Sequence, residues 1–126
     1  MFNITLQTFL FCLTAPKELI LKLEGSAKEY WSTYKNGVYI LDDTPVNGRS
    51  HWKKGDHAIW YNSKYSQWFG GLTKEFGGDS CALHSAKNAT APHLANSWHY
   101  WNGSDYSNGT DWIQSSDISV VIGKGG

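Results

Sequence analysis

The sequence lacks an excess of charge of either sign. Its 126 residues include 11 Lys or Arg and 11 Asp or Glu, so the formal net charge is zero, and the basic residues are scattered along the chain. Proteins that bind nucleic acid or an anionic membrane carry clustered positive charge. We therefore expect a partner that is not a nucleic acid, and no insertion into a membrane.

Cysteine is also scarce, since the chain contains two, Cys12 and Cys81. Two cysteines are too few for the disulfide framework of a small secreted domain. A chain of this length buries a core without such cross-links. A single bridge between the two residues stays open, and cysteine usage does not decide the compartment.

Long apolar runs are missing too. The most apolar stretch, residues 1–16, resembles the apolar region of a signal peptide and has Ala15 as a cleavage site, but it lacks basic residues and is too short to span a bilayer. Four N-x-S/T sequons favour a secreted glycoprotein slightly over a cytoplasmic protein. They lie at Asn3, Asn88, Asn102 and Asn108. Cleavage of residues 1–16 stays open.

Aromatic residues and glycines, in contrast, are abundant: the chain has seven Trp, seven Tyr and 13 Gly. Aromatic residues favour strands, and glycine-rich turns are typical of all-β domains. The length indicates one domain, which we place at 17–122 and follow with a flexible tail at 123–126. We predict an all-β fold, either a small antiparallel β-sandwich or an open barrel of about seven or eight short strands.

The clearest element is a β-hairpin at 57–72. Two aromatic runs flank the polar residues 62–64, and Gly70-Gly71 is expected to close the second strand. Trp60 and Trp68 are expected to anchor the core from the two arms. Further strands are predicted at 17–24 (with a short helix as the alternative), 38–41, 49–53, 80–85, 97–101, 111–113 and 118–122.

Turn-forming residues separate these strands. Asn47-Gly48 is typical of a tight hairpin turn. Residues 42–45 are expected to form a loop because Pro45 donates no hydrogen bond. Residues 86–96 are small and polar and contain a proline, so we expect them to form a surface excursion.

Several short motifs follow one another in a distinctive order. They are Leu23-Glu24-Gly25, Asn36-Gly37-Val38-Tyr39, Val46-Asn47-Gly48-Arg49, Ile59-Trp60-Tyr61, Gln67-Trp68, Ser97-Trp98 and Ile118-Ser119-Val120. This order resembles that of small aromatic-rich β-modules that recur beside other domains in multidomain eukaryotic proteins. The resemblance spans residues 19 to 121, although the loops at 73–96 and 102–111 are longer than such a module needs. It implies an accessory domain without established chemistry and transfers no catalytic residue.

Exposed aromatic side chains are the main candidates for a binding face. Adjacent residues of a strand face opposite sides, so Trp60 and Tyr61 cannot both enter one core. We expect an exposed set of Tyr61, Tyr65, Tyr100 and Tyr106, and a buried set of Trp52, Trp60, Trp68, Trp98 and Trp112. Trp101 fits either set. Exposed rings stack on the apolar faces of sugars or anchor protein contacts.

The loops at 42–49, 62–66 and 102–111 complete this predicted site. They add Asn102, Asp105 and Arg49 as polar ligand contacts. Arg49 is the single arginine of the chain, and we favour a structural ion pair with Asp42 or Asp43 over stacking on a ring. The resulting hypothesis is a non-catalytic module that binds a carbohydrate or a protein surface. The alternative is a self-assembly domain with an aromatic interface, and the third is a small enzyme.

Metal and catalytic signals are weak. The five histidines show no zinc-ligand spacing, and no cofactor is expected apart from calcium, for which Asp42, Asp43 and Asp105 are candidate ligands. Cys81 and His84 are the nearest approach to a catalytic pair. Their odd spacing in a strand predicts opposite faces, so Cys81 is expected to lie inward beside Leu83.

Overall fold

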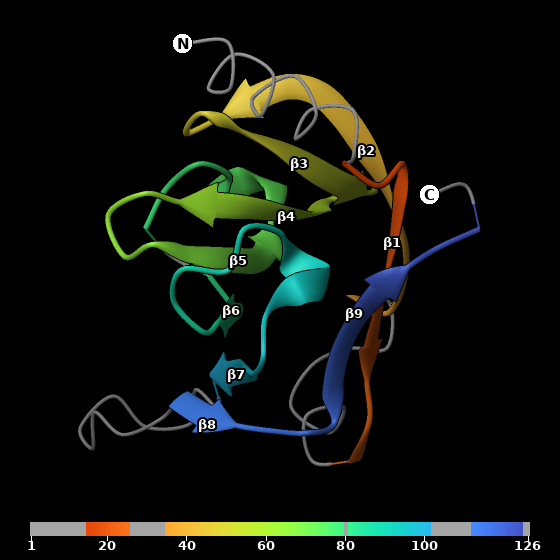
Figure 1. Ribbon diagram of the computed structural model, residues 1–126, viewed down its shortest axis with the longest axis vertical. Helices are drawn as coiled ribbons and strands as arrows, with labels where there is room; N and C mark the ends of the chain where they lie inside the picture. Colours follow the sequence, from red (N-terminus) through yellow and green to blue (C-terminus); the bar gives the residue numbers. More distant parts are fainter. Residues whose placement is uncertain (1–14, 26–34, 80, 102–111, 125–126) are drawn as a thin grey trace, which may run out of the picture.

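The computed structural model describes residues 15–25, 35–79, 81–101 and 112–124, which form one antiparallel β-sheet (Figure 1). The strands are β1 (Glu18–Leu23), β2 (Gly37–Val46), β3 (Arg49–Lys54), β4 (His57–Asn62), β5 (Gln67–Leu72), β6 (Leu83–Ser85), β7 (Trp98–Trp101), β8 (Trp112–Gln114) and β9 (Ile118–Ile122). Two 3-10 turns, η2 (Thr73–Glu75) and η3 (Pro92–Leu94), lie between strands. The all-β prediction is confirmed, with nine strands in place of seven or eight.

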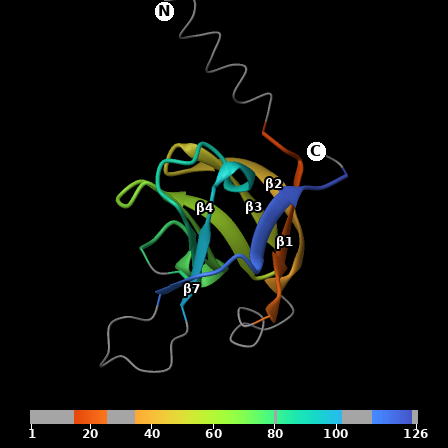
Figure 2. The same cartoon turned by 60° about the horizontal axis from the view of Figure 1, so that its bottom comes forward.

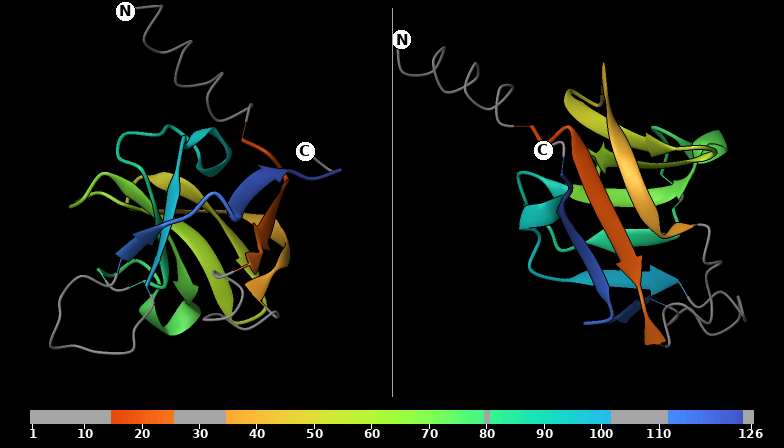
Figure 3. Two further views of the ribbon diagram at one scale, coloured as in Figure 1. Left: turned by 90° about the horizontal axis from the view of Figure 1, so that it is seen from below. Right: turned by 90° about the vertical axis from the view of Figure 1, so that its right-hand side faces the viewer.

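The sheet coils into a nearly closed barrel. Its strand order is β8-β7-β6-β5-β4-β3-β2-β1-β9, so each strand from β1 to β8 pairs with the next, and β9 returns to pair with β1. Figure 2 and the left panel of Figure 3 show the sheet curling round until β9 comes close to β7. Beside this gap, the backbone N–H of Ser115 donates to the carbonyl of Trp98, with 3.0 Å between N and O. Of the two predicted architectures, the barrel is therefore the right one.

The barrel interior holds the main core. Alternate residues of the strands point inward, and the interior includes Leu19, Leu21, Leu23, Tyr39, Trp52, Ile59, Trp68, Leu83, Trp98, Tyr100, Ile118 and Val120. The rings of Trp52 and Trp68 meet edge to face, with 5.8 Å between their centroids. Each large apolar side chain buried in this way contributes about 1.5 to 3 kcal/mol.

A second, smaller cluster lies on the outside of the barrel. Ala58, Trp60 and Phe69 are buried there beneath the segment that contains η2, and the ring of Phe76 contacts Trp60 edge to face at 5.7 Å. We call this the outer cluster. Trp60 and Trp68 are both buried as expected, but they anchor different clusters because they lie on opposite faces of the sheet.

Two predicted strand ends are wrong for related reasons. Strand β2 runs on through 42–45 to Val46, and its register with β3 shifts between Asp42 and Val46. Pro45 lies within this irregular part, where the pairing is already interrupted and its missing N–H removes no ladder bond. Gly70 and Gly71 continue β5 rather than closing it; a Cβ on Gly70 would lie 3.4 Å from Leu83, so the glycine allows strand β6 to approach closely.

The turn prediction at Asn47-Gly48 is confirmed. Both residues have positive φ, 53° and 81°, as the tight turns favoured in hairpins require. The strand at 18–23 is confirmed over its helical alternative. None of the helical segments that the structure describes is long and apolar enough to cross a membrane.

Candidate functional site

The four tyrosines predicted to be exposed have different outcomes. Tyr65 is 40% exposed, as predicted, and Tyr61 is half-buried. Tyr100 is only 3% exposed, so its prediction is wrong. It pairs with Leu83 and Ile113 across the sheet and points into the barrel, because β7 turns His99 and Trp101 outward instead. Tyr106 lies outside the described residues, as do Asn102 and Asp105.

Among the tryptophans, Trp112 departs from prediction. Its side chain is 37% exposed, whereas Trp52, Trp60, Trp68 and Trp98 are buried as expected. Trp112 pairs with Trp101 on the outer face of the last hairpin, where the two rings lie 5.2 Å apart. Its ring also contacts His84 at 4.3 Å. Trp101 is half-buried.

Arg49 does not form the expected ion pair. Its guanidinium carbon lies 4.1 Å from the ring centroid of Tyr61, and its Nη1 donates to the carbonyl of Thr90 at 3.3 Å. The stacking alternative is thus the observed one. Asp42 is instead 3.6 Å from Nε2 of His51 and 3.7 Å from Nζ of Lys53.

Two of the three calcium candidates, Asp42 and Asp43, lie within the described residues, and Asp105 lies outside them. The backbone N–H of Thr44 donates to Asp42 at 2.9 Å, and this bond lowers the pKa of the carboxyl group, with the neighbouring His51 and Lys53 adding to the effect. Asp43 is exposed. Across the described ranges, no group of three or more His, Cys, Asp or Glu side chains is arranged to hold a metal ion.

A shallow groove of about 260 Å³ opens on the outer face of the barrel, over β5, β6 and β8. We call it the outer groove. It is lined by Tyr65, Gln67, Phe69, Asp79, Cys81, His84 and Trp112. The rings of Tyr65 and Phe69 stack with an interplanar angle of 26°. The groove therefore combines aromatic surfaces with amide, carboxylate and imidazole groups.

Hydrogen bonds fix the polar walls of the outer groove. Buried Asn62 donates to Oδ1 of Asp79 at 2.7 Å and to the carbonyl of Gly78 at 3.1 Å, and its own Oδ1 accepts from the N–H of Tyr65 at 2.8 Å. On the opposite wall, Nε2 of Gln67 donates to the carbonyl of Ser85 at 3.0 Å and lies 3.2 Å from Nδ1 of His84. These bonds hold the side chains in place before any ligand arrives.

Cys81 and His84 both line this groove, so the prediction that they face opposite sides is wrong. Strand β6 begins only at Leu83, and the alternation of a strand does not extend back to Cys81. Cys81 packs against the outer cluster instead of lying inward with Leu83. Burial raises the pKa of its thiol, and the carboxylate of Glu75 adds to this, so the thiol is protonated at neutral pH.

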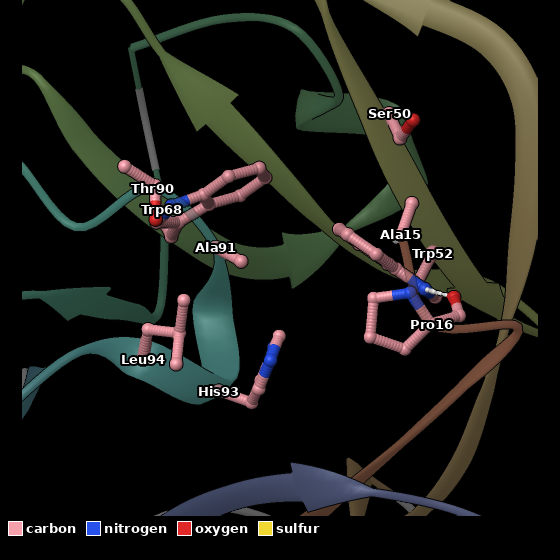
Figure 4. Close-up of a pocket in the computed structure, with 9 residues that line it drawn as sticks. All are labelled: Ala15, Pro16, Ser50, Trp52, Trp68, Thr90, Ala91, His93 and Leu94. Carbon is pink, nitrogen blue, oxygen red and sulfur yellow. Dashed lines mark hydrogen bonds between the residues drawn. The ribbon is translucent and has the colours of Figure 1, made fainter. Parts of the chain in front are cut away.

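A second hollow, of about 260 Å³, lies at one end of the barrel (Figure 4). Strands β1, β3 and β5 all begin at this end, since alternate strands of the sheet run in the same direction. The wall is formed by Pro16 before β1, by Trp52 and Trp68 from the interior, and by Ala91, His93 and Leu94 around η3. We call it the barrel-end pocket.

Sequence reasoning missed this pocket because it treated 86–96 as a surface excursion. Ala91 and Pro92 are in fact buried, and the segment packs across the end of the barrel. The apolar residues of Ala91-Pro92-His93-Leu94 were the available signal, because a solvated loop has no need of them.

The comparisons with known proteins add no assignment to either hollow. No protein-family model matches the chain, and neither a curated protein nor a solved structure matches it.

Proposed function

We propose that this protein is a non-catalytic binding module that recognises carbohydrate through the outer groove. The observation that carries the proposal is the combination of exposed rings, Tyr65 and Trp112, with hydrogen-bonding side chains in one open groove. Sugar rings offer apolar C–H faces, which stack on aromatic side chains, and hydroxyl groups, which need donors and acceptors.

The make-up of the groove favours a sugar over a protein surface. Asp79 accepts hydrogen bonds, Gln67 both donates and accepts, and His84 offers a ring nitrogen, so one sugar has several complementary partners within a small area. Protein interfaces are centred on a desolvated apolar patch. Asp79, in contrast, is exposed at the rim, where its carboxylate lies 3.8 Å from Nζ of Lys64.

A binding role also agrees with the protonation of Cys81, the candidate nucleophile. A protonated, buried thiol is a poor nucleophile, and burial likewise lowers the pKa of His84 and leaves its imidazole neutral at pH 7. Neither group is activated by the other in the way that a catalytic pair requires.

The test is a screen of the full chain against an array of neutral oligosaccharides, followed by calorimetric titration of the best ligand. We expect Tyr65→Ala and Trp112→Ala each to weaken binding by about tenfold, the loss that removal of one stacked ring produces. The matched control is Ile40→Ala, which removes another exposed apolar side chain, from the outer face of β2. Chelation of calcium is expected to leave the affinity unchanged.

Two results would overturn the proposal. One is an array without any bound glycan. The other is binding that persists in both ring variants or disappears on chelation, because the ligand would then be held elsewhere.

A different observation favours self-association as a second candidate function. Ile20, Val38 and Val121 form a row across β1, β2 and β9, and Ile40 extends it along β2. Val38, Val121 and Ile40 are 42%, 43% and 52% exposed. These four side chains, here called the aliphatic row, lie on the face formed by β2, β1 and β9, which the right panel of Figure 3 presents to the viewer.

A further inference from the structure

We infer that Asn88 is the acceptor of a covalently attached, N-linked oligosaccharide. The sequence Asn88-Ala89-Thr90 is one of the four N-x-S/T sequons of the chain, and it is the one that falls within the residues that the structure describes. The inference concerns a glycan that the chain carries, whereas the outer groove is a site for a glycan that it binds. It therefore does not depend on the proposed function.

The side chain of Asn88 is accessible in the folded protein. Asn88 lies in a turn between β6 and η3 and is exposed. Its side-chain amide forms no hydrogen bond with any residue in the described ranges. A glycan is bulky and hydrated, so a folded protein carries one on a side chain at its surface. The fold thus leaves room for a glycan on Asn88.

Main-chain hydrogen bonds hold the sequon in place. The N–H of Asn88 donates to a carbonyl of the turn between β4 and β5, with 2.8 Å between N and O. The carbonyl of Ala89 accepts from the indole N–H of Trp68 at 2.9 Å. The carbonyl of Thr90 accepts from Nη1 of Arg49 at 3.3 Å. The backbone of the sequon is therefore anchored, while the side chains of Asn88 and Thr90 are exposed.

The conformation of the turn accounts for the asparagine of the sequon but not for its threonine. Asn88 has a positive φ of 68°, which asparagine adopts more readily than most residues and glycine adopts without steric cost. Thr90 is exposed, and its hydroxyl forms no hydrogen bond within the described part of the chain. The turn needs only the first of these two residues, whereas an acceptor sequon requires both.

Attachment of the glycan requires a transferase and an oligosaccharide donor of the polyprenyl-diphosphate class. Nδ2 of Asn88 forms a bond with the anomeric carbon of the first sugar, and the bond between that carbon and the diphosphate breaks. The diphosphate leaves with the electron pair of the broken bond, and one amide proton passes to a base of the transferase. The side chain is uncharged before and after this step, and no oxidant or reductant takes part.

The test expresses the full chain behind an added secretory leader in cultured eukaryotic cells. An endoglycosidase trims each glycan to a single N-acetylglucosamine, and mass spectrometry of proteolytic peptides then locates this sugar. We expect it on Asn88 in most molecules of the secreted chain. Thr90→Ser preserves the sequon and should preserve the modification. Asn88→Gly and Thr90→Ala each destroy the sequon and should abolish the modification at this position.

A second measurement shows whether these substitutions disturb the fold. Glycine adopts the positive φ of Asn88, and the side chain of Thr90 makes no hydrogen bond that alanine would lose. Asn88→Gly and Thr90→Ala produced in bacteria should therefore have urea midpoints close to that of the unmodified chain. The glycosylated chain should unfold at a midpoint no lower than theirs, because its glycan extends from an exposed side chain into solvent.

Three results would contradict the inference. They are an unmodified Asn88 in the secreted chain, a modification that persists in Thr90→Ala, and a urea midpoint of the glycosylated chain that lies clearly below that of Thr90→Ala. None of these results bears on the oligosaccharide array, which can be screened with chain that is produced in bacteria and carries no glycan. Failure of the array screen likewise leaves the inference about Asn88 unaffected.

Discussion

Asn62 is a buried polar residue on which the geometry of the outer groove depends. Its side chain is 2% exposed and forms hydrogen bonds with Gly78, Asp79 and the backbone N–H of Tyr65. Asn62→Ala removes all three and leaves the carbonyl of Gly78 without this donor. We expect the free energy of unfolding to fall by about 1 to 3 kcal/mol, as for other buried hydrogen-bonding groups that lose their partners. Urea unfolding of the variant measures this loss.

The control for this prediction is Asn96→Ala, since Asn96 is exposed and a substitution there should change stability by less than about 0.5 kcal/mol. The Asn62 substitution should also weaken any ligand of the outer groove, because Tyr65 and Asp79 are no longer held in place. If Asn62→Ala proves as stable as Asn96→Ala, the three bonds are replaced by water at little cost, and Asn62 is not the support of the groove.

At the scale of strands and turns, local patterns predicted most of the fold. Aromatic runs and Asn-Gly turns depend on the preferences of neighbouring residues, and they correctly placed the 57–72 hairpin and the turn at 47–48. The errors at Pro45 and Gly70 have another origin. Each error depends on a neighbouring strand. Pro45 lies where the register of β2 shifts against β3, and Gly70 lies where β6 approaches β5 closely. The sequence of one strand does not determine its register with the neighbouring strand.

The candidate sites were less predictable for the same reason. Alternation within a strand indicates that Trp101 and Tyr100 face opposite sides, but it does not say which side is the interior. That choice is set by closure of the sheet, which turned Tyr100 inward and Trp112 outward. Tyr65 lies in a hairpin turn, where exposure follows from local structure, and its prediction is confirmed.

The aliphatic row on β2, β1 and β9 allows a prediction about assembly. A row of β-branched side chains exposed on a sheet face loses its contact with water when a second copy covers it. We expect sedimentation velocity to show a mass that rises from monomer to dimer with protein concentration. Ile40→Lys should keep the protein monomeric, because a charge would then be buried in the contact.

Leu94→Lys is the matched control, since Leu94 is 57% exposed but lines the barrel-end pocket and is not part of the aliphatic row. It should dimerise like the unmodified chain. If the protein stays monomeric at all concentrations, the prediction of self-association is wrong. Dimers that persist in Ile40→Lys would place the contact on another face.

For the molecule as a whole, the histidines couple stability to pH. Burial is the largest cause of a lowered pKa at each of His51, His57, His84, His93 and His99. Below the ordinary histidine pKa of 6.5, the unfolded chain therefore binds more protons than the folded one, and the free energy of unfolding falls as the pH decreases. The stabilisation is complete above pH 6.5 and is lost as the pH falls through the lowered pKa values.

Other shifted groups act outside this range of pH. Burial lowers the pKa of Lys35 from 10.5 to about 8, so its contribution changes only in alkaline solution. The pKa of Asp42 is lowered from 3.8, chiefly by the hydrogen bond from Thr44, so its contribution is lost only at a pH below that value. The decline just below pH 6.5 consequently belongs to the histidines, and urea midpoints measured from about pH 8 to about pH 4.5 should show it.

His51→Phe measures how much His51 contributes to the loss of stability below pH 6.5. The imidazole of His51 is 1% exposed and packs against Phe76 with 4.5 Å between ring centroids, so a phenyl ring fits the site without a group that titrates. The slope of stability against pH should be smaller in this variant than in the unmodified chain. A urea midpoint that stays constant between about pH 7 and about pH 5 would mean that the rings accept protons in place, with water reaching them through the sheet.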